Sequence, residues 1–387
     1  MARADGARAD RPATCGHRPP CPGCPRYGEP GIAAEVRAIL DALARSHGVP
    51  PPSLVSGALA GFRHRARLAI RGRLGSPKIG LFETGTHRVV HIPDCPVHHP
   101  LINRVASIVR RALIDAGVTC YSDAAHLGLA RYLQVVVERR SQSAQVVLVG
   151  NSAMLEPLRA PFEAIRAHLG SQLHSLWFNP NQERTNTILG REFLAWCGPP
   201  SVVERFGGAE VHYPPGAFGQ NNLDIADEIV AYLRAEVPAG ARVAEFYAGV
   251  GAIGLSLLDR AAELRMNEFA PSSLHGLALG LAALGKSQRA KVSVWPGTAA
   301  AAAPAARAMD VVIADPPRKG LDAGLVASLV AAPPPRLLYV SCDPRSLAGD
   351  AAALGAGGAL RLRSLRAFNL FPFTEHVETV AVFEREC

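Results

Sequence analysis

The feature that most constrains the fold is an apolar run followed at once by a glycine turn, in the stretch ARVAEFYAGVGAIG of residues 241–254. Gly249, Gly251 and Gly254 have the spacing Gly-x-Gly-x-x-Gly, which lets a backbone approach a nucleoside and predicts a following helix that closes the turn. Further apolar runs then alternate with Ala/Leu-rich helical segments. Residues 213–387 are therefore predicted to form an α/β, Rossmann-like domain with a doubly wound, mostly parallel sheet.

The residues that end the next strands indicate the ligand. Glu268 ends the strand after the glycine turn, where a carboxylate can accept hydrogen bonds from a ribose. The glycine turn and Glu268 together fit a dinucleotide or S-adenosylmethionine about equally, and a glycine turn with a purely structural role is the alternative. The stretch MDVVIADPPRKGL, however, ends a strand in Asp315 and two prolines, a rigid lip typical of methyltransferases that act on planar nucleobases. Arg318 follows the prolines in place of an aromatic residue, which argues against enzymes that methylate amino nitrogens.

A cysteine stands where the apolar run RLLYVS stops and Asp343-Pro344 indicates a helix start. A buried cysteine is most often an inert small hydrophobe. In doubly wound sheets, however, ligands lie at the carboxyl ends of the strands, so Cys342 and Asp315 are expected to face one crevice. A thiolate there can add to C6 of uracil, which makes C5 nucleophilic enough to attack a methylsulfonium.

Such a reaction also needs a base that removes the C5 proton before the thiol leaves. Glu378 lies in a strand of otherwise apolar residues, where burial raises the pKa of a carboxyl. A solvated edge-strand carboxylate is the alternative interpretation of Glu378. His376 and Glu375 are competing candidates for the base.

Five motifs together resemble those of a known family, the S-adenosylmethionine-dependent RNA uracil-C5 methyltransferases, which make 5-methyluridine in tRNA and rRNA. They are FGQNN, FYAGVG, DPPRKG, SCDPRSLAGD and FPFTEHVETV, in the order of that family. The resemblance runs from Cys15 to Glu378. It implies that Cys342 is the nucleophile and Glu378 the proton acceptor. The predicted cofactor-binding residues are Gln220, Tyr247, Glu268 and Asp315, with Gly249 and Gly251 of the turn.

Two positions depart from the family pattern. Ala248 stands where a cysteine is common, and no acidic residue follows VSVWPG. The second departure leaves open how adenine is recognised.

Three cysteines near the start of the chain, Cys15, Cys21 and Cys24, have the spacing Cys-x5-Cys-x2-Cys, and Cys95 in IPDCPVHHP is a natural fourth ligand. Four thiolates suit zinc or an iron–sulfur cluster, and the spacing does not separate the two. A zinc site that includes His98 or His99, or a free cysteine-rich tail, are further alternatives. The resemblance implies a [4Fe-4S] cluster held by an N-terminal segment of residues 1–30.

The basic charge is concentrated in the first half of the chain. Residues 1–215 hold 25 Lys and Arg against 16 Asp and Glu, a net +9, whereas residues 216–387 hold 16 against 17, a net −1. In FRHRARLAIRGR, five arginines share one strand parity, which predicts a basic face for RNA phosphates, with a merely solvated face as the alternative. They are Arg63, Arg65, Arg67, Arg71 and Arg73.

Residues 31–212 are predicted to form a helix followed by an α+β, β-rich RNA-binding domain. No apolar run reaches membrane-spanning length and no signal peptide is present, so a cytoplasmic monomer without membrane contact is expected.

The predicted function is methylation of C5 of a specific uridine in RNA. The target is expected to be 23S rRNA, because family members with this cluster mostly act on it. The chain is also expected to start directly at the cluster, without the small β-barrel (TRAM) domain of some relatives. A tRNA uracil-C5 methyltransferase is the alternative within the class. A non-catalytic RNA chaperone and a nicotinamide dehydrogenase are the alternatives from other classes.

Overall fold

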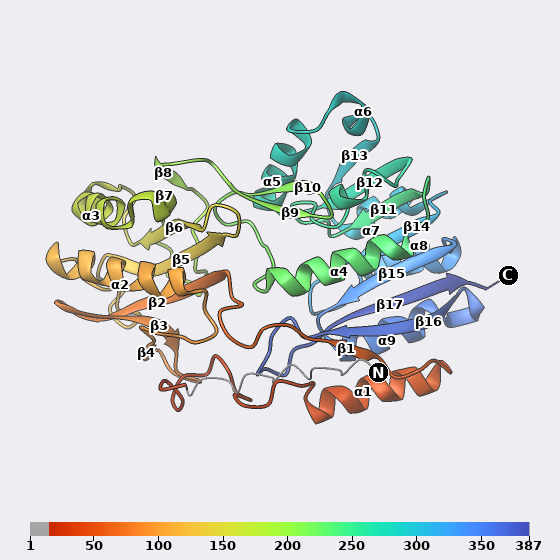
Figure 1. Cartoon of the computed structure of the whole chain (residues 1–387), viewed down its shortest axis with the longest axis horizontal. Helices are drawn as coiled ribbons and strands as arrows, with labels where there is room; N and C mark the ends of the chain where they lie inside the picture. The colour runs from red at the N-terminus through yellow and green to blue at the C-terminus, as the bar shows by residue number, and fades with distance from the viewer. Residues whose placement is uncertain (1–14, 387) are drawn as a thin grey trace, which may run out of the picture.

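The computed structural model of the chain describes residues 15–386, so predictions for residues 1–14 and 387 lie outside the described range. Two separate sheets dominate the described part, and they lie side by side in Figure 1. A third, two-stranded sheet is the hairpin of β9 (Val202–Phe206) and β10 (Ala209–Tyr213).

The central domain is built on a seven-stranded sheet that is antiparallel except for one parallel pair, β6 and β7. Its strands, in sheet order, are β4 (Val89–His91), β3 (Ser76–Phe82), β2 (Arg65–Arg73), β5 (Ala130–Glu138), β6 (Ser143–Gly150), β7 (Leu173–Pro180) and β8 (Leu194–Cys197). Helices α2 (Pro100–Asp115) and α3 (Arg159–Leu169) pack their apolar sides on one face of the sheet. The structure therefore has the β-rich α+β region that the sequence predicts.

The C-terminal domain is built on an eight-stranded sheet in which β17 is the one antiparallel strand. Its strands, in sheet order, are β1 (Ser53–Val55), β16 (Leu360–Phe368), β17 (Glu378–Arg385), β15 (Arg336–Ser341), β14 (Val311–Ala314), β11 (Arg242–Phe246), β12 (Glu263–Glu268) and β13 (Val292–Pro296). The predicted doubly wound, mostly parallel sheet is thus confirmed.

Both faces of this sheet are covered, which is why its central strands are apolar almost throughout. On one face lie α4 (Leu223–Glu236), α5 (Pro271–Ala282) and the β9–β10 hairpin. On the other face lie α1 (Ala34–Ser46), α7 (Ala299–Ala302), α8 (Ala323–Ala331) and α9 (Pro344–Leu354). The short helix α6 (Lys286–Arg289) leads into the edge strand β13.

Two expectations from the sequence need correction. The predicted central domain of residues 31–212 begins too early. Strand β1 pairs with β16 in the eight-stranded sheet and helix α1 packs beside α9, so both elements belong to the C-terminal domain. The helix expected after Gly254 is only a short 3-10 turn, Leu255–Leu257. Few residues separate this turn from β12, which leaves no room for an α-helix in the crossover.

The start of β2 is fixed to the C-terminal domain. The N–H of His64 donates to the carbonyl of Asn221, and the guanidinium of Arg65 stacks on the ring of Tyr213 at 4.2 Å. Next to this start, just after the end of β5, Arg139 binds the buried carboxylate of Glu204 in β9 at 2.8 Å and that of Asp227 in α4. These contacts hold the central domain against the β9–β10 hairpin, α4 and the loop that precedes α4.

Candidate active site

The carboxyl ends of four parallel strands bring the predicted residues to one edge of the sheet. Tyr247 follows β11, Glu268 ends β12, Asp315 follows β14 and Cys342 follows β15. The strand register aligns Phe246 with Ala314 and with Asn267, so the residues that follow them, Tyr247, Asp315 and Glu268, emerge at the same level. Strand β15 runs on past Tyr339, the partner of Ala314, so Cys342 lies slightly further out at the same edge. This edge is where ligands bind in doubly wound sheets.

The antiparallel strand β17 brings Glu378 beside Cys342. Ser341 pairs with Thr379 in the antiparallel β15–β17 ladder. The residue after Ser341, Cys342, therefore lies beside the residue before Thr379, Glu378. Cys342 is half-buried, whereas the side chain of Glu378 is only 3% exposed. Glu375 and His376 are both exposed, so Glu378 is the buried carboxyl among the three candidate bases.

Burial gives this site unusual acid–base properties. It raises the pKa of Cys342 to about 11, with the charges of Glu378 and Asp315 adding to the effect and Arg318 opposing it. It also raises the pKa of Glu378 well above the usual carboxyl range, and that of Asp315 to about 7. In the free protein, burial therefore favours the neutral thiol of Cys342 and the neutral carboxyl of Glu378 over their anions.

Arg318 is the cation of this edge. Its guanidinium donates to Nε2 of His376 over 3.1 Å, and its charge favours the ionised forms of both Cys342 and Glu378. Burial, followed by the charge of Arg318, lowers the pKa of His376, which keeps this imidazole a neutral acceptor. The sequence interpretation used Arg318 only to exclude one enzyme class and missed this role.

The lip after β14 is held by residues that the sequence interpretation did not single out. Asp350 of α9 accepts hydrogen bonds from the hydroxyl of Tyr339 at 2.6 Å and from the N–H of Leu321 at 2.9 Å. The N–H of Asp322 donates to the hydroxyl of Tyr247 at 2.9 Å. Asp350 occurs in the motif SCDPRSLAGD, but only its contacts show that it anchors the neighbouring loop.

The glycine turn after β11 has the conformation that the sequence predicts. Gly249 and Gly251 have φ of 59° and 92°, in the left-handed region that favours glycine. A Cβ at Gly251 would lie 2.9 Å from Cδ1 of the buried Leu277, so a side chain there would press on the core and shift this turn, which is called the cradle below. Tyr247 also has a positive φ, of 60°, which costs energy for a bulky residue and sets its ring beside the turn.

Glu268 has a structural role in addition to its predicted one. Its carboxylate accepts hydrogen bonds from the N–H groups of Gly249, Phe269 and Ala270 at 2.6–2.7 Å. These bonds join the glycine turn to the start of α5. Phe269 is 68% exposed beside this carboxylate, and such an exposed ring is a further candidate for contact with a flat ligand.

Gln220 lies half-buried in the loop before α4. Asn222 of the same FGQNN motif caps α4 by accepting a hydrogen bond from the N–H of Ile225 at 3.3 Å. Asn222 of the motif thus starts helix α4, and Gln220 lies in the loop before that helix.

The four predicted cysteine ligands converge. Cys15, Cys21, Cys24 and Cys95 all line one cavity of about 100 Å³, together with Arg63 and His98. Burial, followed by the neighbouring thiol of Cys95, raises the pKa of Cys24 to about 11.

Within residues 15–386, no three His, Cys, Asp or Glu side chains come close enough together to hold a single metal ion. The Nδ1 atom of His99 accepts a hydrogen bond from the N–H of Leu101 at the start of α2, so this ring nitrogen is already occupied.

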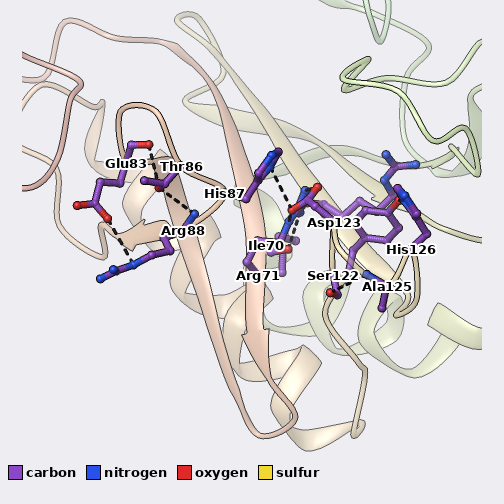
Figure 2. Close-up of polar contacts among 12 residues, drawn as sticks. Ile70, Arg71, Glu83, Thr86, His87, Arg88, Ser122, Asp123, Ala125 and His126 are labelled. Carbon is purple, nitrogen blue, oxygen red and sulfur yellow. Dashed lines mark hydrogen bonds and ion pairs between the residues drawn. The ribbon is translucent and has the colours of Figure 1, made fainter.

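The five arginines do not form one exposed basic face, which corrects the sequence prediction. Arg67 and Arg73 are exposed, although Arg67 also donates to the side-chain oxygen of Gln134 at 2.8 Å. Arg65 stacks on Tyr213, and both Arg63 and Arg67 line the cysteine cavity. Figure 2 shows Arg71 pointing toward Asp123, with which it forms two hydrogen bonds of 2.7 and 2.9 Å. The twist of β2 and its packing between β3 and β5 turn alternate side chains toward different partners.

In the part of the chain that the structure describes, no helix has the length and apolar character needed to cross a bilayer.

Comparison with known proteins places this edge in context. A family model described as tRNA (Uracil-5-)-methyltransferase matches residues 305–386, which include Asp315, Cys342 and Glu378. An uncharacterized RNA methyltransferase of Protochlamydia amoebophila is 33% identical over 383 residues, or 96% of this chain and 97% of the relative. Another, of Geobacter sulfurreducens, is 30% identical over 341 residues, or 84% of this chain and 66% of the relative.

A solved structure supports the fold. The crystal structure of Pyrococcus abyssi tRNA (uracil-54, C5)-methyltransferase in complex with S-adenosyl-L-homocysteine has a TM-score of 0.77 to this chain. The match covers 94% of this chain and 84% of that one, at 22% identity. The two chains thus share their fold across both sheets.

Proposed function

Because this chain belongs to the RNA uracil-C5 methyltransferase family and is an S-adenosylmethionine-dependent enzyme of that family, we propose that it acts through a covalent adduct between Cys342 and C6 of a uridine. The observation that carries the proposal is the β15–β17 register, which sets the thiol of Cys342 beside the carboxyl of Glu378. A nucleophile and a base side by side are what substitution at C5 requires.

The residues of this chain would act in the following order. The thiol of Cys342 and the carboxyl of Glu378 would first give their protons to water. The sulfur of Cys342 would then bond to C6 while the electron pair of the C5–C6 π bond moves onto O4 as an enolate. C5 of this enolate would bond to the methyl group, and the electron pair of the broken methyl–sulfur bond would stay on the cofactor's sulfur. When bound, S-adenosylmethionine supplies the electrophilic methyl group and a positive sulfonium charge. The carboxylate of Glu378 then takes the proton from C5, the C5–C6 double bond re-forms, and the thiolate of Cys342 leaves.

The edge of the sheet fits this cofactor. The cradle at Gly251 has no room for a Cβ, and the carboxylate of Glu268 faces the turn. We propose that Gln220, Tyr247, Glu268 and Asp315 bind the cofactor, with the backbone at Gly249 and Gly251. Arg318 would favour the thiolate and the carboxylate that the reaction needs, since a nearby cation stabilises both anions.

The proposed substrate is 23S rRNA, on the strength of the cysteine motif, with tRNA as the second candidate because both the matching family model and the solved structure carry tRNA in their names. Mapping 5-methyluridine in 23S rRNA and tRNA from cells with and without the gene tests the choice. Loss of the modified nucleoside from tRNA alone would refute the rRNA assignment.

We propose that Cys15, Cys21, Cys24 and Cys95 hold a [4Fe-4S] cluster. The support for this proposal is that the four cysteines line one cavity, since cysteine thiolates are the ligands that hold iron–sulfur clusters. Anaerobically purified protein should contain iron and acid-labile sulfide. Zinc without sulfide would refute the cluster.

RNA phosphates are proposed to contact the exposed Arg67 and Arg73, because charge on the central domain attracts a polyanion regardless of sequence. Arg63, Arg65 and Arg71 are engaged inside the protein, so the proposal does not extend to phosphate contacts by them.

The covalent mechanism is tested with RNA that carries 5-fluorouridine, which has no C5 proton to lose and therefore traps the adduct. Cys342→Ala should abolish both methyl transfer and the adduct, whereas Glu378→Gln should accumulate methylated adduct on natural RNA. Cys197→Ala serves as the matched control, because Cys197 lies on β8 of the central sheet. Appreciable turnover by Cys342→Ala would refute the assignment of the nucleophile.

A further inference from the structure

The loop that leads into Glu378 packs on the cysteine-bearing segment of the chain. This loop, residues 369–377, connects β16 to β17. Its residue Phe373 is fully buried in a small core with Phe62 and Val97, against which the cysteines Cys24 and Cys95 also pack. The ring of Phe373 lies 4.8 Å from that of Tyr27, centroid to centroid. Phe373 thus shares one core with two of the four cysteines.

Hydrogen bonds tie the same two segments together. The N–H of Arg26 donates to the carbonyl of Phe373 at 2.9 Å, and the guanidinium of Arg26 donates to the carbonyl of Thr374 at 3.4 Å. The side chain of Asn369 donates to the carbonyl of Pro30 at 2.5 Å. Segment 26–30, directly after Cys24, therefore anchors the loop at both its start and its middle.

The backbone of Phe373 depends on these contacts. Its φ is 66°, in the left-handed region that is unfavourable for a bulky side chain. Such a conformation persists only where the surroundings hold it. For Phe373 the surroundings are the cysteine-bearing segment.

A short chain of contacts leads from Phe373 to the base. The hydroxyl of Thr374 donates to the carbonyl of Phe371 at 2.8 Å and accepts the N–H of His376 at 3.1 Å. The ring of His376 then accepts from Arg318, the cation beside Cys342 and Glu378. Glu378 follows two residues later as the first residue of β17. The loop thus connects Phe373, through Thr374 and His376, to the cation that lies beside the base.

A second link runs through Arg63. Its side chain lines the cysteine cavity, and its guanidinium lies 5.9 Å from the centroid of the Phe371 ring. Its N–H and carbonyl bind residues on either side of His98, Val97 and His99, in the loop that carries Cys95. Two aromatic residues of the loop thus contact the walls of the cavity.

We propose that Phe373 is a positioning residue: it seats the loop of residues 369–377 on the cysteine-bearing segment, so that the state of the cysteine cavity controls removal of the C5 proton by Glu378. This role rests on the proposed function. It predicts that a substitution that disturbs the cysteine cavity slows product release from the adduct. Cofactor binding at the distant ends of β11 and β12 should not change.

The test compares two buried phenylalanines in the full-length holoenzyme. Phe373→Leu removes the packing against Tyr27, and Phe162→Leu removes similar packing against Trp196 in the core of the central domain, where the ring centroids are 5.6 Å apart. In single turnovers with natural RNA, Phe373→Leu should slow product release on the order of 10- to 100-fold, as small misplacements of reacting groups do. Methylated RNA–protein adduct should then accumulate on denaturing gels. Affinity for S-adenosylhomocysteine should not change in either variant.

The outcomes separate this role from the proposed function. If the wild-type enzyme forms no adduct with 5-fluorouridine RNA, the proposed function fails. If it does, and Phe373→Leu releases product as fast as Phe162→Leu, the positioning role is refuted while the mechanism stands.

A measurement without turnover covers the case in which Phe373→Leu does not fold. Hydrogen exchange of residues 369–377 should be faster in Cys24→Ser than in the wild type, with α3 as an internal reference that does not change. Unchanged exchange in residues 369–377 would refute the coupling.

Discussion

Cys342 of the free enzyme should be a weakly reactive thiol whose pKa is set by burial, by two carboxyl groups and by one guanidinium. Burial, then Glu378 and Asp315, raise its pKa from the ordinary value of 9.0 to about 11, and Arg318 lowers it. Replacing Arg318 by Ala removes a cation that stabilises the thiolate, so the pKa should rise further. Glu378→Gln removes a carboxylate that is ionised in the alkaline range, so the pKa of Cys342 should fall.

The size of the effect follows from the shift. A pKa difference of 11 − 9.0, about two units, leaves about 100-fold less thiolate near neutral pH. A more basic thiolate is also a better nucleophile, by about 6- to 10-fold for a Brønsted slope of roughly 0.4–0.5. Alkylation of Cys342 near neutral pH should therefore be about 10- to 16-fold slower than that of an ordinary thiol of equal access.

Iodoacetamide labelling of the peptide that contains Cys342, followed by mass spectrometry from neutral to strongly alkaline pH, measures the midpoint of the profile. Lys319→Ala is the matched control for Arg318→Ala, because Lys319 is an exposed cation one residue away that does not perturb Cys342. A wild-type midpoint near 9.0, or equal midpoints in Arg318→Ala and Lys319→Ala, would refute the reasoning.

Three further predictions concern the cradle, the domain junction and the RNA surface. Gly251→Ala should weaken S-adenosylhomocysteine binding at least about tenfold in calorimetric titration while the circular dichroism spectrum is unchanged, because the positive φ and the space both exclude a side chain. Arg139→Ala should lower the free energy of unfolding in urea by about 3 kcal/mol, since it removes the cation paired with the buried carboxylate of Glu204 and leaves that carboxylate only the N–H of residue 139. Arg67→Ala and Arg73→Ala should each reduce the log–log salt slope of RNA binding by roughly 0.7–0.9, whereas Arg71→Ala should lower the melting temperature and leave that slope unchanged.

Local patterns were enough to predict the edge of the sheet. A residue that directly follows an apolar parallel strand has its position fixed by the strand, so Asp315, Glu268 and Cys342 could be placed at one edge from the sequence. The reversed strand β17 could not be recognised as such from its apolar pattern. Only its register shows that Glu378, and not the exposed Glu375 or His376, lies beside the thiol.

The sequence by itself determined which functional residues end the parallel strands, the glycine turn and the close spacing of Cys15, Cys21 and Cys24, because each depends on neighbours within a few residues. The tertiary structure decided what long-range contacts control. It assigns β1 and α1 to the C-terminal domain and buries Arg71 against Asp123. It also packed Phe373 of the last loop on the first described segment of the chain. The alternation of side chains along a strand predicts which face of the sheet a residue lies on. The residue that it contacts on that face comes from a distant part of the chain, so no local pattern predicts the contact.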